Sequence, residues 1–63
     1  MKREWLIAFR KAKGLTQKEL AEAIGVSQIS LSTYEQGIRT PKPQVAKKIA
    51  RVLGFEWTKF YED

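Results

Sequence analysis

Residues 17–36 read QKELAEAIGVSQISLSTYEQ, and the fold is predicted most clearly from these twenty residues. Gly25 interrupts it where a positive φ would end one helix and turn the chain toward the next. Ala21 lies where two helices would cross, and its small side chain permits a close approach. Five apolar side chains recur at the spacing of two short helices with a shared seam: Leu20, Ile24, Val26, Leu31 and Tyr34. The pattern predicts a helix-turn-helix, in which two helices meet at a steep angle across a tight turn.

Capping residues support the same two helices. Thr16 and Glu19 have the spacing of a capping box, in which each side chain accepts a hydrogen bond from the backbone N–H of the other residue. Ser27 is of a residue type preferred at a helix N-cap. These signals predict helices over 15–24 and 26–36. A tight helical hairpin uses the same residue types and is the alternative, but the basic segments on both sides favour the helix-turn-helix.

The rest of the chain adds three helical segments. Residues 2–13 form an amphipathic pattern, residues 43–53 begin with a proline suited to a first helical turn, and residues 55–63 form a short aromatic turn. The sequence therefore predicts one all-α domain over residues 1–63, with four helices and a short fifth. The core residues expected outside the central stretch are Trp5, Leu6, Phe9 and Ala12, some of Val45, Ile49, Val52 and Leu53, and Phe55 with Phe60.

The composition excludes several classes of function. Histidine and cysteine are absent, which removes the usual general base near neutral pH, the commonest zinc ligand and all disulfides. The longest unbroken apolar run, 5–9, is too short for a membrane span or a signal-peptide core. Glu19 and Glu22 have the spacing of a solvated helix face rather than of a catalytic pair. The sequence indicates a cytoplasmic protein that is not an enzyme, needs no cofactor or metal, and has no membrane partner.

The formal net charge of +5 is concentrated in two segments. Residues 1–18 hold six cations and one acid, and residues 36–53 hold five cations and no acid, whereas residues 19–35 between them hold three acids and no cation. A basic surface raises the local concentration of polyanions, nucleic acid above all. Lysines that simply keep a small protein soluble are the alternative explanation.

These features together resemble the Cro- and lambda-repressor-like family, also called the xenobiotic-response-element family. The resemblance covers nearly the whole chain and rests on 6-LIAFRKAKGLTQKELAEAIGVS-27, 31-LSTYEQG-37, Pro41 and 49-IARVLG-54. It implies a fold of four or five helices in which the second and third form the DNA-reading pair. It also implies a small phage- or bacterial-type transcriptional regulator, of the repressor type, that binds operator DNA as a dimer.

The outward positions of segment 26–36 are expected to face bases, because Leu31 and Tyr34 face inward and a reading helix lies in the major groove. Gln28 suits adenine, since its amide can pair with N6 and N7. Ile29 suits a thymine methyl group, or alternatively packs partly buried within the protein. The expected base-contacting residues are Gln28, Ile29, Ser32 and Thr33.

Phosphate contacts are expected from two helix N-termini and from the loop after Gly37. A helix N-terminus offers free N–H groups and a partial positive charge. By resemblance, the loop follows the DNA backbone, and the residue that matches Gln17 commonly clamps a phosphate. Such contacts set the register of the protein without reading sequence. The expected phosphate-contacting residues are Thr16, Gln17, Lys18, Ser27, Gln36, Arg39, Thr40 and Lys42.

Arg10 and Glu35 resemble a family pair that bridges the first helix to the end of the reading helix. If partly buried, such a pair fixes the reading helix in place more than it adds net stability. Two separate surface charges are the alternative arrangement.

Trp57 and Tyr61 form the candidate dimer surface, because large aromatic residues are enriched at interfaces. Their alternative role is to close the core. A dimer must hold its reading helices about 34 Å apart to reach successive major grooves. The expected partner is therefore double-stranded DNA with an inverted-repeat operator, bound by a homodimer. No small-molecule ligand is expected in so short a chain.

The sequence departs from the family pattern at two places. Residues 27–35 contain no Lys, Arg or Asn, so Gln28 is the one strong two-bond reader, worth roughly 1–3 kcal/mol of discrimination. Specificity then depends on symmetry, methyl contacts or DNA shape. The uncharged face leaves open a second function, a module that docks onto a toxin, polymerase or larger regulator. Glu56 stands where Asp, Ser or Thr would cap the last helix, which predicts a weak last turn.

Overall fold

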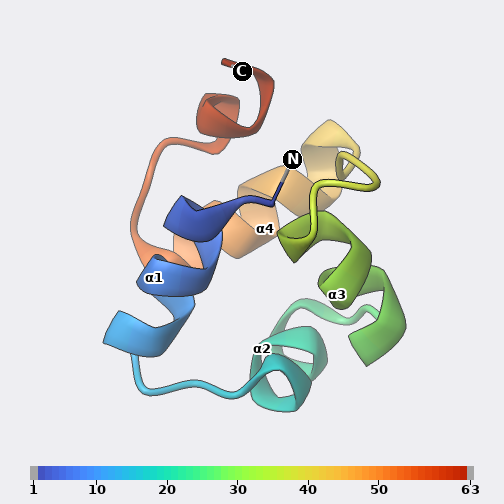
Figure 1. Cartoon of the computed structure of the whole chain (residues 1–63). Coiled ribbons are helices and arrows are strands. Elements are labelled where there is room, and N and C mark those ends of the chain that lie inside the picture. The colour runs from blue at the N-terminus through green and yellow to red at the C-terminus, as the bar shows by residue number, and fades with distance from the viewer. Residues whose placement is uncertain (1, 63) are drawn as a thin grey trace.

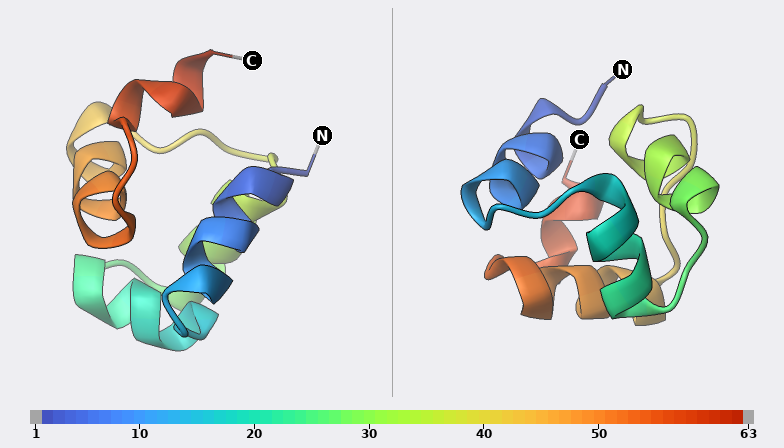
Figure 2. Two further views of the ribbon diagram at one scale, coloured as in Figure 1. Left: turned by 90° about the vertical axis from the view of Figure 1, so that its left-hand side faces the viewer. Right: turned by 90° about the horizontal axis from the view of Figure 1, so that it is seen from below.

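The structure is a computed structural model and describes residues 2–62. These residues form α1 (Glu4–Ala12), α2 (Gln17–Ile24), α3 (Gln28–Glu35), α4 (Pro43–Leu53) and the 3₁₀ helix η1 (Trp57–Tyr61). The described residues contain no strand, so the all-α prediction is confirmed. Figure 1 shows α1 and α3 on opposite sides, α2 below them and α4 behind them. The two further views in Figure 2 show the same arrangement from the side and from below.

The caps of α2 and α3 form as predicted. Thr16 Oγ1 accepts a hydrogen bond from the Glu19 N–H at 3.1 Å, and Glu19 Oε1 accepts one from the Thr16 N–H at 2.9 Å. Ser27 Oγ accepts one from the Ser30 N–H at 3.0 Å. Gly25 has a φ of 77°, which residues with a Cβ rarely adopt, and it ends α2 and begins the turn to α3.

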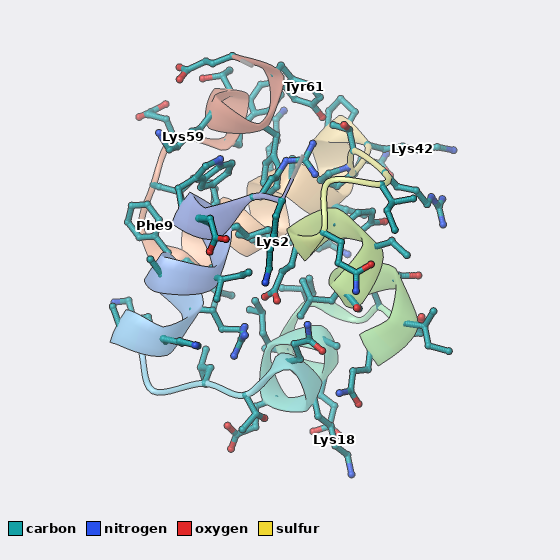
Figure 3. The ribbon with its side chains drawn as sticks, in the orientation of Figure 1. Lys2, Phe9, Lys18, Lys42, Lys59 and Tyr61 are labelled. Carbon is teal, nitrogen blue, oxygen red and sulfur yellow. The ribbon has the colours of Figure 1, made fainter. Side chains whose placement is uncertain are left out.

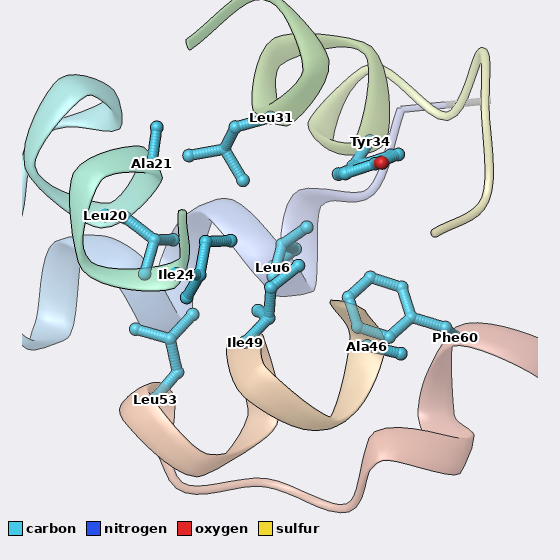
Figure 4. Close-up of a cluster of buried hydrophobic side chains, with 10 residues drawn as sticks. All are labelled: Leu6, Leu20, Ala21, Ile24, Leu31, Tyr34, Ala46, Ile49, Leu53 and Phe60. Carbon is cyan, nitrogen blue, oxygen red and sulfur yellow. The ribbon is translucent and has the colours of Figure 1, made fainter. Parts of the chain in front are cut away.

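One cluster of buried apolar side chains joins all five elements (Figure 4). α2 packs against α3 and α4, α1 packs against α3, and η1 packs against α4. Ala21 is buried and faces Leu31 across the contact between α2 and α3, as predicted. The shared core fixes which side of α3 points inward. Its members are Leu6, Leu20, Ala21, Ile24, Leu31, Tyr34, Ala46, Ile49, Leu53 and Phe60.

The core differs from the sequence prediction in α1 and α4. Ala12 is exposed, because α1 ends at this residue and the chain turns away. In α4, Ala46 and Ala50 are buried, whereas Val45 and Val52 are only half-buried. Positions 46, 49, 50 and 53 form one helical stripe. α4 therefore turns its small residues inward, which lets its backbone lie close to its neighbours.

Aromatic rings close the C-terminal side of the core. The ring centroid of Phe55 lies 5.2 Å from that of Trp5 and 5.1 Å from that of Phe9, and Phe60 is buried. The core role predicted for Phe60 is thus confirmed, whereas Phe55 is half-buried and packs against the core from outside. Glu56 precedes η1 and makes no side-chain cap hydrogen bond. A five-residue 3₁₀ helix at this position agrees with the weak last turn predicted from Glu56.

Candidate nucleic-acid interface

α3 has an inner face in the core and an outer face in solvent. Leu31 and Tyr34 are buried, as predicted. Gln28 and Ile29 are exposed, Ile29 to 79%, so the alternative in which Ile29 packs within the protein is wrong. Ser32 and Thr33 are half-buried. The outer face is therefore most open at the N-terminal end of α3, which is the end that contacts base edges in a helix-turn-helix.

The hydroxyl groups along α3 already have hydrogen-bond partners within the protein. Thr33 Oγ1 donates to the carbonyl oxygen of Ser30 at 2.6 Å. Gln36 Nε2 donates to Ser32 Oγ at 3.1 Å. The exposed amide of Gln28 is thus the polar side-chain group on α3 that is best able to take new partners.

The N-terminus of α2 lies beside the C-terminal end of α3. Gln17 Nε2 donates to Glu35 Oε1 at 2.8 Å, so the side-chain amide of Gln17 is turned toward α3. Because Thr16 and Glu19 satisfy each other's N–H groups, the backbone N–H groups of Gln17 and Lys18 are the first-turn donors without a partner in the helix. Such donors suit an anion such as phosphate.

Exposed cations lie on α2 and on the loop that follows α3. In Figure 3, Lys18 projects from α2 at the bottom of the view, and Lys42 projects from the end of the loop before α4 at the upper right. Arg39, Thr40 and Lys42 are exposed in and beside the loop between α3 and α4. Ile38 in this loop is 69% exposed, and the sequence analysis missed it. The sequence does not indicate this exposure, because an apolar side chain after a helix-ending glycine can point either into the core or into solvent.

The predicted Arg10–Glu35 pair is present. Arg10 Nε donates to Glu35 Oε2 at 2.6 Å, and Arg10 Nη1 donates to the carbonyl oxygen of Leu15 at 2.9 Å. The Glu35 side chain is only 2% exposed. Since its other oxygen accepts from Gln17, Glu35 joins α1, α2 and α3 at one buried point. The C-terminal end of α3 is therefore held from two sides.

Several cations of the chain contact other groups of the protein. Arg10 forms the ion pair, and Arg3 is buried with its guanidinium group on backbone carbonyls. Lys47 and Lys59 lie over tryptophan rings, with Nζ 5.0 and 5.2 Å from the ring centroids. Because Arg10 is ion-paired and Arg3 is buried, the unpaired surface charge of the two basic segments is smaller than the sequence pattern indicates. Arg3 gave no signal of burial, because it precedes α1 in a run of charged residues.

The residues of the candidate dimer surface are accessible. Trp57 is half-buried and Tyr61 is 45% exposed, and their ring centroids lie 5.8 Å apart in an edge-to-face arrangement. The Tyr61 hydroxyl donates to the carbonyl oxygen of Pro41 at 2.7 Å. Neither ring is buried as Phe60 is, so both present aromatic surface to solvent.

Two kinds of feature are missing from the described part of the chain. No helix among residues 2–62 has the length and apolar character needed to cross a membrane. The same residues do not gather three or more His, Cys, Asp or Glu side chains in a group that could hold a metal ion.

A pair of short helices that meet at a glycine turn, with an open outer face on the second helix and exposed cations on the loop that follows it, defines a helix-turn-helix domain. A family model described as helix-turn-helix matches residues 6–60, and the chain belongs to this family. The resemblance to Cro- and lambda-repressor-like regulators is thereby confirmed.

Similar proteins agree with this assignment. YqaF of Bacillus subtilis, an uncharacterized HTH-type transcriptional regulator, is 44% identical over 63 residues, which cover 100% of this chain and 83% of YqaF. The N-terminal DNA binding domain of SinR from Bacillus subtilis has a TM-score of 0.81 at 31% identity, over 95% of this chain and 88% of that domain. A chain of a SinR–SinI complex has a TM-score of 0.83 at 31% identity, and this chain spans 62% of its length.

Proposed function

We infer that this chain is a sequence-specific DNA-binding transcriptional regulator whose α3 lies in the major groove of double-stranded DNA. The observation that carries this inference is the open, uncharged outer face of α3, with exposed cations on α2 and on the loop that follows α3. A major groove about 12 Å wide admits an α-helix of this kind. Membership of the helix-turn-helix family and similarity to the SinR DNA-binding domain support the same function.

Phosphate contacts supply much of the affinity in this proposal. The exposure of Arg39 and Lys42 supports it, as do the unpaired first-turn N–H groups of Gln17 and Lys18. Because the Gln17 side chain is bonded to Glu35, its backbone N–H is the group that reaches a phosphate without any rearrangement. The proposed phosphate-contacting residues are Thr16, Gln17, Lys18, Ser27, Gln36, Arg39, Thr40 and Lys42.

Base edges are read by the N-terminal half of α3. Gln28 binds an adenine through its amide, and Ile29 contacts a thymine methyl group. Ser32 and Thr33 are half-buried and hydrogen-bonded within the protein. Their short side chains contact only bases that lie close to the surface of α3. A single amide reader gives limited selectivity, so the two-fold symmetry of the site and the DNA shape supply the remainder.

A homodimer on an inverted repeat is the proposed assembly, with Trp57 and Tyr61 at the contact between protomers. Their exposure and aromatic character support this role. Repression is the proposed outcome, because a domain that occupies operator DNA blocks other proteins by occupancy alone.

Selection of bound duplexes from a random pool tests the proposed function. We expect enrichment of an inverted repeat whose half-sites lie about 10 base pairs apart, or a multiple of that spacing. Affinity should fall steeply between about 50 and 200 mM salt. A pool without enrichment, or an affinity insensitive to salt, would contradict DNA binding and favour the alternative of a module that docks onto a toxin, polymerase or larger regulator.

Gln28→Ala is expected to weaken binding to the selected duplex by about 1–3 kcal/mol and to leave binding to random duplex unchanged. Fluorescence anisotropy with both duplexes measures this difference. Gln36→Ala is the matched control, since it removes the same amide from a residue proposed to contact phosphate and should weaken both duplexes alike. Equal losses on both duplexes for Gln28→Ala would rule out base reading by this residue.

Replacement of both Trp57 and Tyr61 by alanine is expected to weaken dimerisation on the selected duplex by about 2 kcal/mol or more, because aromatic anchors dominate interface energies. Sedimentation velocity of the protein–duplex mixture reports how many protomers are bound. Tyr61→Phe, which keeps the ring and loses the hydrogen bond to Pro41, should still dimerise. An unchanged sedimentation profile for the double variant would remove this surface from the dimer model.

A further inference from the structure

Arg3 lies where the N-terminal segment, the end of α3 and the loop before α4 meet. Its backbone N–H donates to the Glu35 carbonyl oxygen at 2.8 Å. Its Nη1 donates to the carbonyl oxygens of Tyr34 at 2.7 Å and Arg39 at 2.9 Å, and its Nη2 donates to Thr40 Oγ1 at 2.8 Å. One buried side chain, 6% exposed, thus holds the last turn of α3 and the loop together.

The three acceptors require the planar fork of a guanidinium group. Arginine directs several N–H groups at once in a fixed plane, whereas a lysine ammonium acts as a compact point charge. The carbonyl groups of Tyr34, which accepts from the guanidinium group, and of Glu35, which accepts from the Arg3 backbone N–H, belong to the last turn of α3. Carbonyl groups in a last turn lack intrahelical donors, and a cation near them is favourable. Arg3 Nε is buried without a partner, which is costly, so the bonds made by Nη1 and Nη2 must decide where this side chain lies.

Other hydrogen bonds hold the loop between α3 and α4 on either side of the bonds made by Arg3. The N–H groups of Ile38 and Arg39 both donate to the Thr33 carbonyl oxygen, at 3.1 and 3.3 Å. Pro41 is buried and accepts the hydrogen bond from Tyr61. The bonds from Arg3 lie between these two sets of contacts. They hold Arg39 and Thr40, which are proposed to contact phosphate.

We propose that Arg3 is a positioning residue for DNA binding: it holds Arg39 and Thr40 in place against α3 so that both meet the DNA backbone without rearrangement. This inference rests on the proposed function. Arg3 itself is too buried to touch phosphate, so its effect is indirect. A loop that must be ordered on binding weakens the complex, because the ordering entropy is then lost at that step. Since phosphate contacts carry no sequence information, the effect is the same on every duplex.

Two variants and one control test this proposal. Arg3→Met removes the charge and the side-chain hydrogen bonds but keeps the backbone bond to Glu35, and Arg3→Lys keeps the charge but loses the planar guanidinium group. Arg51→Met is the matched control, because Arg51 is an exposed arginine in the last turn of α4, at the opposite end of that helix from the loop. Thermal unfolding establishes that each variant is folded. Amide hydrogen exchange of Ile38 and Arg39 in the free protein reports the order of the loop, with the core amides of Leu20 and Ile49 as references.

Both Arg3 variants are expected to bind selected and random duplexes about tenfold more weakly than the native chain, as for loss of one charged hydrogen bond, with a shallower salt dependence. Exchange at Ile38 and Arg39 should accelerate while the reference amides stay unchanged. Arg51→Met should bind almost as the native chain does.

The proposal is wrong if the Arg3 variants bind as Arg51→Met does, or if exchange in the loop is unaltered. Native affinity of Arg3→Lys would also overturn it, since charge alone would then suffice. Failure of the native chain to bind any duplex would instead refute the proposed function. In that case the hydrogen-exchange measurement would still test, separately, whether Arg3 orders the loop. If Arg3→Met does not fold, Arg3→Lys carries the same comparison.

Discussion

Glu35→Ala is expected to lower the free energy of unfolding by about 3–5 kcal/mol, because it leaves Arg10 half-buried and charged without its partner. The Gln17 amide loses its acceptor at the same time. A 63-residue domain has a total stability of only about 3–9 kcal/mol, so most or all of the margin is lost. Urea unfolding followed by circular dichroism measures the change.

Two controls make this test specific. Glu22→Ala removes an exposed carboxylate from α2 and should change the free energy of unfolding by less than about 0.5 kcal/mol. The double variant Arg10→Met/Glu35→Met removes both charges with little change in volume, and it should recover much of the loss. A loss below about 1 kcal/mol for Glu35→Ala, the size expected of an exposed pair, would contradict its role in anchoring α3.

Leu31→Ala is expected to lower the free energy of unfolding by about 2–5 kcal/mol. Leu31 is fully buried on the inner face of α3 and faces Ala21 of α2. Because the side chain of Ala21 is a single methyl group, which cannot reach into the vacated space, the truncation leaves a cavity at the contact between the two helices. Thermal unfolding and urea unfolding both measure the loss.

Ile29→Ala is the matched control on the same helix. Ile29 lies two residues earlier and is exposed, so its truncation should change the free energy of unfolding by no more than about 0.5 kcal/mol. It should nevertheless weaken binding to the selected duplex by removing the contact with a thymine methyl group. A loss of stability equal to that of Leu31→Ala would contradict the assignment of inner and outer faces on α3.

The helix-turn-helix was predictable because its signals are local. The Thr16–Glu19 capping box and the Ser27 cap depend on residues three positions apart, and Gly25 marks the turn by its own backbone preference. Leu31 and Tyr34 then fix the inner face of α3 by spacing alone, which leaves Gln28 and Ile29 outside.

Other features depend on contacts distant in sequence and were not predictable from it. Arg3 meets the loop before α4 across more than thirty residues, and a charged residue near a chain end carries no sign of burial. In α4, the burial of Ala46 and Ala50 in place of the valines is set by how closely the helices pack. The bond from Thr33 to Ser30 is local, but it depends on a side-chain rotamer that sequence does not specify.

Part of the candidate site was predictable and part was not. The Arg10–Glu35 pair followed from resemblance to the family, and its geometry is confirmed. Burial of Arg3 and the ion pair of Arg10 reduce the free positive charge of the surface below the number of cations in the sequence. The contacts with bases, phosphates and a second protomer stay predictions.

Backbone amide NMR during titration with the selected duplex tests most directly that the outer face of α3 meets DNA. We expect the largest chemical-shift changes at Gln28, Ile29 and Arg39. Ala8 and Ala12, exposed on α1 at the opposite side of the molecule, should be unaffected. Changes concentrated on α1, with those of α3 unmoved, would contradict the account.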